Sequence, residues 1–522
     1  MRAEPPEEEE EADWALSADE EEDFEDIELT ESLKESGAIT IPSRDVKKAI
    51  GPDREEWRTA LDAELTSLRT SGAIDVVTHI PRGIKPLPMK MVTTIKPIPS
   101  SSAKKKKARA CVCGNFQKKE ANEMLYTANS DIASIRIALA EAAQDPSQGV
   151  SSLDVDTAFL NTPMPEDEDQ QVYVYPPSLL VDFGILPAGE VWKLKRAVYG
   201  LRVSPRLWGK ERDKALMALR FSVDGVKMRL FQASVDAALW TIIDDKDFPQ
   251  IHMHTTYGHI LTYVDDFLIV GSKAVRKRIE EEIAQQWKCK KTGSVDQLFG
   301  QTTAPVQSLT FLSTTIRSPP KGGFILEQEA FTKDLLATWQ LSDSRPASTP
   351  GDPAGLELSL ETPEEDIDPS DVWKAQKLAG SLIWLSTRTR PDLAYAQSRI
   401  SSMATTAPKQ ALLEGKRVLR YLKGTEDVGL WFKPTVVGNV MAYGDASFAI
   451  KRSQTGIVVK LGENNIRWRS SKQPQVAKST ADSEVTAMAA TSIEGEFVKA
   501  LRESILLPTP VVEIKCDNRA AI

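Results

Sequence analysis

Apolar residues recur every three or four positions in several stretches of this chain, a spacing typical of amphipathic helices. Within residues 53–72 the spacing places on one face Trp57, Leu61, Leu65 and Leu68. Similar stretches predict helices over residues 129–145, 203–221 and most of 371–432. Ser130 is the expected cap of the helix over 129–145, because a serine side chain can accept a hydrogen bond from the first turn.

A second pattern, in which short apolar runs are bounded by turn residues, predicts strands. Residues 86–118 are expected to form two strands joined by a link, and a basic run from Lys104 to Arg109 follows that link. The C-terminal part is expected to form strands over 441–447, 455–460, 466–469 and 512–518. The sequence Ser479-Thr480-Ala481-Asp482 is a capping pattern, so a helix is expected from Ser479 to about Glu503.

One apolar run leads into the adjacent pair Asp265-Asp266, and a second apolar run follows the pair and ends at Gly271. This arrangement predicts a β-hairpin with both acids at its tip. Two carboxylates among apolar side chains are costly unless a cation neutralises them. A pair of divalent metal ions that handle phosphates would do so. The alternative interpretation is an ordinary surface turn.

If this hairpin belongs to a polymerase site, a third carboxylate should lie upstream on another apolar strand. Residues 152–160 supply one. Asp154 and Asp156 project to one face of this predicted strand, and Leu153 and Val155 project to the other. We therefore expect Asp154 to lie near the acids of the hairpin in the folded chain.

Composition and charge change this picture mainly at the N-terminus. The 522 residues are 41% hydrophobic and 27% charged, which is ordinary for globular protein and long enough for three or four domains. Residues 1–36 hold 17 acidic and 2 basic residues, a net charge of −15, whereas the whole chain carries −10, so the remainder carries about +5. We expect an acidic disordered tail over residues 1–40. The alternatives are that the tail binds a protein partner or occupies a basic cleft.

The sequence favours an intracellular location, in the cytoplasm, in the nucleus or in both. No stretch has the length of an apolar membrane span, and the acidic N-terminus lacks the features of a secretory signal. No second cysteine or histidine pair completes a zinc site by spacing. We therefore interpret the four cysteines as free thiols of a reducing compartment; they are Cys111, Cys113, Cys289 and Cys516.

From about Glu56 to Ile522 the chain resembles the C-terminal part of a copia-type LTR retrotransposon Pol polyprotein, in which reverse transcriptase is followed by ribonuclease H. The most distinctive block runs from Val191 to Arg202. The other blocks, in the family's order, are Glu56-Trp57 with Ala60 to Leu65, Lys107-Ala108-Arg109, Leu153 to Asn161, Tyr263-Val264-Asp265-Asp266, and Gly380-Ser381-Leu382 with Arg390 to Ala396.

The resemblance implies an α+β chain with a right-hand polymerase of fingers, palm and thumb over residues 50–345. A linker over 346–370, a connecting helical segment over 371–433 and a ribonuclease H-like domain over 434–522 would follow. Its partners would be an RNA template, a DNA primer, RNA–DNA hybrids and dNTPs, within cytoplasmic virus-like particles or the nucleus.

The resemblance also assigns roles to individual residues. Two Mg²⁺ ions for nucleotide transfer would be held by Asp154, Asp265 and Asp266. The incoming nucleotide would be contacted by Lys107, Arg109, Phe159 and Tyr263, with Phe159 as the gate that crowds a ribose 2′-hydroxyl. Two more ions, for cutting the RNA of a hybrid, would be held by Asp445, Glu484 and Asp517.

Some positions depart from the family's pattern. Cys113 stands where the family usually has a basic residue, and Val203 where it generally has a polar amide. Because the chain stops soon after Asp517, we expect an incomplete ribonuclease H domain with impaired cleavage. Two alternatives to a working polymerase stay open: a degenerate remnant that binds nucleic acid without synthesis, and a host-recruited interaction protein.

Overall fold

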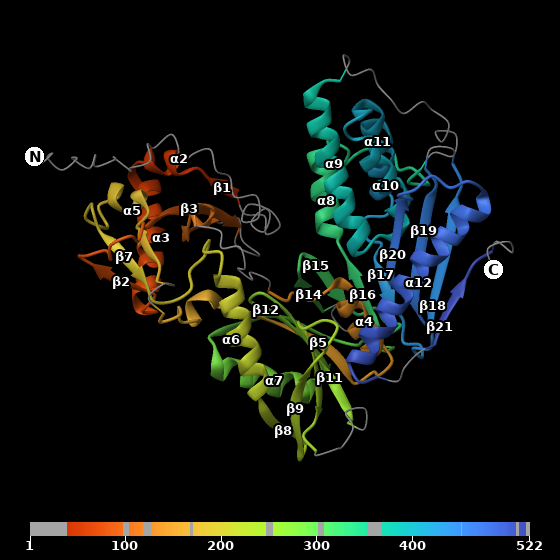
Figure 1. Ribbon diagram of the computed structural model, residues 1–522, viewed down its shortest axis with the longest axis horizontal. Helices are drawn as coiled ribbons and strands as arrows, with labels where there is room; N and C mark the ends of the chain where they lie inside the picture. The colour runs from red at the N-terminus through yellow and green to blue at the C-terminus, as the bar shows by residue number, and fades with distance from the viewer. Residues whose placement is uncertain are drawn as a thin grey trace, which may run out of the picture. The chain divides into compact units, whose positions relative to one another are not determined.

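The computed structural model describes residues 39–97, 104–117, 127–167, 171–246, 254–300, 307–351, 367–449, 452–507 and 511–517 (Figure 1). The chain divides into two compact units, one formed by residues 1–126 with 159–208 and the other by 127–158 with 209–522. Most of the predicted acidic tail, the link 99–103 and most of the linker 346–370 lie outside the described residues.

The first unit contains a six-stranded sheet in the order β1-β3-β6-β7-β2, with β4 added to β3. Its strands are β1 (Ile39–Ile41), β2 (Ile74–Val77), β3 (Leu87–Pro97), β4 (Lys104–Val112), β6 (Tyr173–Tyr175) and β7 (Val191–Leu194). Its helices are α2 (Ser43–Lys47), α3 (Gly51–Thr70) and α5 (Ser178–Asp182). The predicted helix is confirmed, because α3 buries all four residues of the expected face. The predicted pair of strands is confirmed as the antiparallel β3 and β4.

The distinctive block from Val191 to Arg202 passes very close to β4. The N–H of Val112 donates a hydrogen bond to the carbonyl oxygen of Tyr199 at 2.8 Å. Gly200 follows with φ +82°, and a Cβ there would lie 2.1 Å from the carbonyl oxygen of Val112. Both the backbone angle and the close approach therefore require glycine at this position.

The second unit begins with a seven-stranded antiparallel sheet in the order β13-β5-β12-β11-β10-β9-β8. Its strands are β5 (Gln148–Val155), β8 (Arg220–Val223), β9 (Val226–Gln232), β10 (Leu239–Asp244), β11 (Thr256–Tyr263), β12 (Asp266–Ser272) and β13 (Cys289–Asp296). The accompanying helices are α4 (Ile132–Ala143), α7 (Lys273–Gln286) and, from Gly209 onward, α6 (Ser204–Ala218), whose first turn belongs to the first unit. The predicted hairpin is confirmed as β11 and β12.

Three local predictions in this region need correction. The cap of α4 is Asp131, which accepts from the N–H of Ala133 at 2.7 Å, whereas the hydroxyl of Ser130 donates to the carbonyl oxygen of Thr262 at 3.1 Å. The strand expected to reach residue 160 ends at Val155, and a short 3-10 helix (Ala158–Asn161) follows. The helix expected over 203–221 ends at Ala218, before β8.

A smaller sheet in the order β14-β15-β16-β17 comes next. It contains β14 (Ser308–Phe311), β15 (Thr314–Arg317), β16 (Phe324–Glu327) and β17 (Leu430–Phe432), with α8 (Glu329–Thr338), α9 (Pro369–Arg388), α10 (Ala394–Met403) and α11 (Pro408–Lys423) nearby in sequence. The segment 371–432, which the sequence predicts to be helical, is mostly helical. Its end forms β17 instead, because Leu430 and Phe432 alternate with a less buried residue and fill the core beside β16.

The last sheet has the order β20-β19-β18-β21, with β18 and β21 parallel and the other pairs antiparallel. It is built from β18 (Val440–Ser447), β19 (Gln454–Leu461), β20 (Asn464–Lys472) and β21 (Val512–Lys515). Helix α12 (Thr480–Ser504) lies along this sheet (Figure 1). The predicted cap is confirmed, since the Ser479 side chain accepts from the N–H of Asp482 at 3.2 Å.

One hydrophobic core runs through the three sheets of the second unit. Its buried members come from α4, β12, β16, β19 and α12, for example Ile137, Leu268, Phe324, Val459 and Leu501. The last sheet therefore shares its core with the seven-stranded sheet. The mixture of helices with largely antiparallel sheets confirms the α+β class, whereas the boundaries of the predicted domains stay a prediction. Among the described residues, none of the helices combines the length and apolar character needed to span a bilayer.

Candidate active site

Asp154 and Asp266 are cross-strand partners on β5 and β12. Residues directly opposite in an antiparallel pair project from the same face, with Cβ atoms about 5 Å apart. The row continues on this face to Tyr263 on β11 and to Lys290 on β13. All four side chains are at least partly exposed. The sheet thus presents two neighbouring acids between an aromatic residue and a cation.

Asp265 stands beside this row in the two-residue turn Val264-Asp265. Val264 has φ 50°, which is uncommon for a β-branched residue. Its N–H donates to Asn129 Oδ1 at 3.2 Å, and its carbonyl oxygen accepts from the fully buried Arg212 at 3.4 Å. The N–H of Val155 donates to the carbonyl oxygen of Asp265 at 3.0 Å. These bonds hold the tip of the hairpin against the end of β5.

The electrostatics reflect three carboxylates in a small space. Burial raises the pKa of Asp266 to about 7, and the charges of Asp265 and Asp154 contribute to the increase. Burial also raises the pKa of Cys289 to about 11, with contributions from Asp156 and Asp154. A bound cation would reverse this effect at Asp266, because an opposite charge nearby favours the ionised form.

The donor set fits Mg²⁺, which prefers oxygen ligands and needs few protein carboxylates because it retains water. The residues that would hold it are Asp154, Asp265 and Asp266. Asp156 points to a different role, since it forms an ion pair with Lys288 at 3.1 Å.

The predicted nucleotide-binding residues Lys107, Arg109 and Phe159 lie in the first unit. The Arg109 guanidinium is 4.9 Å from the centre of the Tyr199 ring, and the Phe159 ring meets the same ring edge-on at 5.0 Å. Tyr199 therefore orients both side chains. Lys107 is exposed on β4. The structure thus gives the local setting of each of these residues within that unit.

Glu64 on α3 braces the strand that carries these two cations. Its Oε1 accepts a hydrogen bond from the N–H of Ala110 at 3.0 Å. Burial raises the pKa of Glu64, although this hydrogen bond and the charges of Arg109 and Lys107 oppose the increase.

A second group of acids lies at the end of the last sheet. Asp445 is exposed on β18, Asp517 is exposed just beyond β21, and Glu484 in the second turn of α12 is 7% exposed. Burial raises the pKa of Glu484, with further contributions from the charges of Asp445 and Asp517. The structure thus brings together the three acids predicted for this site. Cys516 joins them, because ligand atoms of Glu484, Cys516 and Asp517 lie within 4.8 Å of one another.

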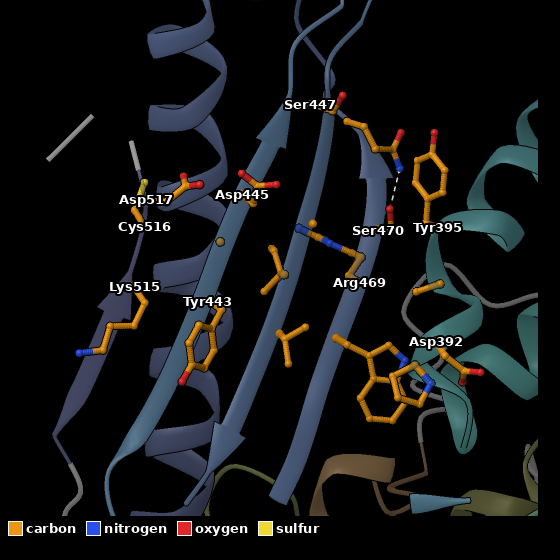
Figure 2. Close-up of a pocket in the computed structure, with 18 residues that line it drawn as sticks. Asp392, Tyr395, Tyr443, Asp445, Ser447, Arg469, Ser470, Lys515, Cys516 and Asp517 are labelled. Atoms are coloured by element: carbon orange, nitrogen blue, oxygen red, sulfur yellow. Dashed lines mark hydrogen bonds between the residues drawn. The ribbon is translucent and has the colours of Figure 1, made fainter. Parts of the chain in front are cut away.

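Asp445, Cys516 and Asp517 line a groove of about 650 Å³. Figure 2 shows Asp445 and Asp517 near one end, with Tyr443 and Lys515 further along the neighbouring strands. Tyr395 on α10 and Arg469 on β20 lie on the other side. Partly exposed rings and cations are the side chains that commonly stack on bases and bind phosphates.

Sequence reasoning missed several residues that shape these sites. The sequence does point to Tyr199, since this residue lies in the most distinctive block of the family resemblance. It does not point to Lys290 or Arg212, because their positions follow from strand register and from packing beneath the hairpin. The spacing of the cysteines gives no sign of a site at Cys516, because its relevant neighbours are carboxylates.

A family model described as reverse transcriptase (RNA-dependent DNA polymerase) matches residues 73–244. The retrovirus-related Pol polyprotein from transposon RE1 of Arabidopsis thaliana is 29% identical over 476 residues, which cover 90% of this chain and 29% of the relative. The corresponding polyprotein from transposon RE2 of the same plant is 30% identical over 502 residues, covering 94% of this chain and 31% of the relative. The chain thus spans about a third of the length of these relatives.

Among solved structures, a foamy viral protease–reverse transcriptase in complex with double-stranded DNA is similar to this chain. It has 12% sequence identity and a TM-score of 0.48, and the match covers 87% of this chain and 62% of the viral protein.

Proposed function

Because the chain belongs to the reverse transcriptase family of copia-type retrotransposon Pol polyproteins, we propose that it is an RNA-directed DNA polymerase. It would extend a DNA primer on an RNA template by using dNTPs. The observation that carries the proposal is the pairing of Asp154 with Asp266 across β5 and β12, with Asp265 in the adjoining turn.

In this proposal the three acids hold two Mg²⁺ ions, which when bound would activate the primer 3′-hydroxyl and neutralise charge on the triphosphate. Asn129 and Arg212 keep the turn in place, so that the acids need little rearrangement. Arg109 and Lys107 provide positive charge for the triphosphate. Phe159 acts as the gate for deoxyribose, and Tyr199 keeps its ring in position.

We propose further that the groove beside Asp445 and Asp517 binds an RNA–DNA hybrid. Tyr443 and Tyr395, each 42% exposed, offer flat apolar surfaces, and Lys515 and Arg469 offer charges for the phosphates. Asp445, Glu484 and Asp517 would hold the ions that direct water at an RNA phosphate.

Primer extension on an RNA template with Mg²⁺ and dNTPs tests the polymerase proposal. The comparison is between the wild type and the double variant Asp265→Asn, Asp266→Asn, which keeps the size of both side chains but removes both charges. We expect extension by the wild type and a loss of roughly a thousandfold or more in the variant, because electrostatic groups of this kind contribute several kcal/mol to catalysis.

The matched control is Asp334→Asn, which removes an exposed carboxylate on α8 outside both acid groups. It should extend primers at the wild-type rate. If folded wild-type protein binds primer–template and extends nothing, the polymerase proposal is wrong and a non-catalytic nucleic-acid-binding remnant is the better description.

A further inference from the structure

Cys516 places a sulfur atom among the acids at the end of the last sheet. Its Sγ, a carboxylate oxygen of Glu484 and a carboxylate oxygen of Asp517 all lie within 4.8 Å of one another. Cys516 is partly buried and Asp517 exposed, so the group is open to solvent on one side. Figure 2 shows the Cys516 sulfur close to the Asp517 carboxylate, where β21 runs out beside β18.

A second observation points to a ligand at this group. Glu484 is 7% exposed, and among the described residues no hydrogen-bond donor is in reach of its Oε2. A buried carboxylate oxygen without a partner is costly. A cation held between Glu484 and the two residues that follow β21 would supply the missing partner.

The donor set differs from that of the hairpin site. Asp154, Asp265 and Asp266 offer oxygen alone, which suits Mg²⁺. A cysteine thiolate is a soft ligand, and a set of one sulfur and two oxygens favours Zn²⁺ over Mg²⁺. Neighbouring ligand atoms around a tetrahedral Zn²⁺ are about 3.5 Å apart, so small side-chain rotations would bring these three atoms to that spacing.

We propose that Glu484, Cys516 and Asp517 form a binding site for a thiophilic divalent cation, with Zn²⁺ as the preferred ion. Three protein ligands leave the fourth position of a tetrahedral ion open to water or to a phosphate oxygen. The site builds on the proposed hybrid-binding groove, because it shares two of its acids. Zn²⁺ here would compete with Mg²⁺ at these acids, and it would tie the end of β21 to α12.

Metal titration of the full-length chain, stripped with a chelator and supplied with Mg²⁺ in excess, tests this proposal. Co²⁺ serves as the spectroscopic probe, since a thiolate ligand gives it a charge-transfer band in the near ultraviolet. We expect that band to appear on Co²⁺ addition and to disappear when Zn²⁺ displaces the probe. Cys516→Ser should abolish the band and weaken Zn²⁺ binding, measured by calorimetry, by roughly tenfold or more.

Cys113→Ser is the matched control, because Cys113 is also a partly buried thiol but lies in the first unit. It should keep the band and the Zn²⁺ affinity. A second variant, Glu484→Gln, should bind Zn²⁺ more weakly and should still give the band when Co²⁺ saturates the site, because the thiolate remains. Absence of the band in the wild type, or equal Zn²⁺ affinity in the wild type and Cys516→Ser, would overturn the proposal. The titration contains no primer–template, so its result is independent of the polymerase assay.

Discussion

The guanidinium of Arg136 lies 3.9 Å from the centre of the Trp468 ring. Arg136 belongs to α4, which packs on the seven-stranded sheet, and Trp468 belongs to β20 of the last sheet. The same guanidinium donates to the carbonyl oxygens of Ile466 at 2.8 Å, Arg388 at 2.8 Å and Thr387. Burial lowers the pKa of Arg136 to about 9. One side chain thus connects α4, α9 and β20.

Replacing this arginine should destabilise the whole second unit. Arg136→Met keeps much of the apolar bulk but leaves three carbonyl oxygens without their donor, so we expect a loss of roughly 2–4 kcal/mol in the free energy of unfolding. Guanidinium unfolding followed by tryptophan fluorescence measures this loss. Lys409→Met, at an exposed position of α11, should change the midpoint little. Equal midpoints for the two variants would show that Arg136 does not hold these elements together.

The raised pKa of Asp266 predicts a pH-dependent stability in the absence of metal. Its pKa rises from 3.8 to about 7, so between these values the folded chain keeps a proton that the unfolded chain has lost. The free energy of unfolding should therefore fall as the pH rises through this window. Asp266→Asn removes the effect, and it should stabilise the metal-free protein by roughly 1–4 kcal/mol at about pH 8 and by little at about pH 4.

Denaturant unfolding in the presence of a chelator, at several pH values, checks this expectation. Asp334→Asn should follow the wild type throughout. A stability difference between wild type and Asp266→Asn that is the same at low and high pH would contradict it. Added Mg²⁺ should stabilise the wild type at high pH more than the variant, because binding to the folded state alone raises stability.

Gly444 controls how closely α12 approaches β18. A Cβ at this position would lie 2.1 Å from Thr491 Oγ1, and Thr491 is fully buried. Gly444→Ala should therefore push α12 outward, lower the free energy of unfolding by roughly 1–3 kcal/mol and weaken metal binding at Glu484. Gly438→Ala is the matched control, since a Cβ there meets nothing within 4 Å. Thermal melts and the Co²⁺ titration measure the two effects. Equal melting temperatures and equal Co²⁺ binding in the two alanine variants would contradict this prediction.

Val264 is strained at the tip of the hairpin, with φ 50°. Asparagine adopts this conformation more readily than a β-branched residue, so Val264→Asn should raise the free energy of unfolding by about 1 kcal/mol. Val436→Asn, at a position 85% exposed, should have little effect. Chemical denaturation compares the two variants. A less stable Val264→Asn protein would mean that the packing of the valine side chain outweighs its strain.

The sequence was sufficient for the features that depend on local pattern. The spacing of Trp57, Leu61, Leu65 and Leu68 predicts the buried face of α3, because a surface helix has one apolar side. The apolar runs around Asp265-Asp266 predict the hairpin, because a continuous strand cannot accommodate both acids in its core. Asp445 and Asp517 could be expected as well, because each lies near the C-terminal end of an apolar strand.

Features that depend on contacts distant in sequence could not be predicted. Helix α4 lies between two sheets and is buried on nearly every side. The spacing of its apolar residues gives no sign that Arg136 contacts Trp468. Ser130 and Asp131 are both good caps, and the local rule cannot choose between neighbours. The strand β17 forms because β16 offers it an edge, which a stretch otherwise typical of helix does not indicate.

The continuous core of the second unit has a geometric consequence. The acids of the hairpin and the acids beside α12 stand on elements that share one packed interior, so the protein itself sets the distance between the two groups. If the chain binds a duplex as proposed, the length of duplex between the two groups would also be set by the protein. A nascent hybrid that reaches from the first group to the second would span a fixed number of base pairs. The number of base pairs between the growing 3′ end and the point of strand scission would then be a constant of the molecule.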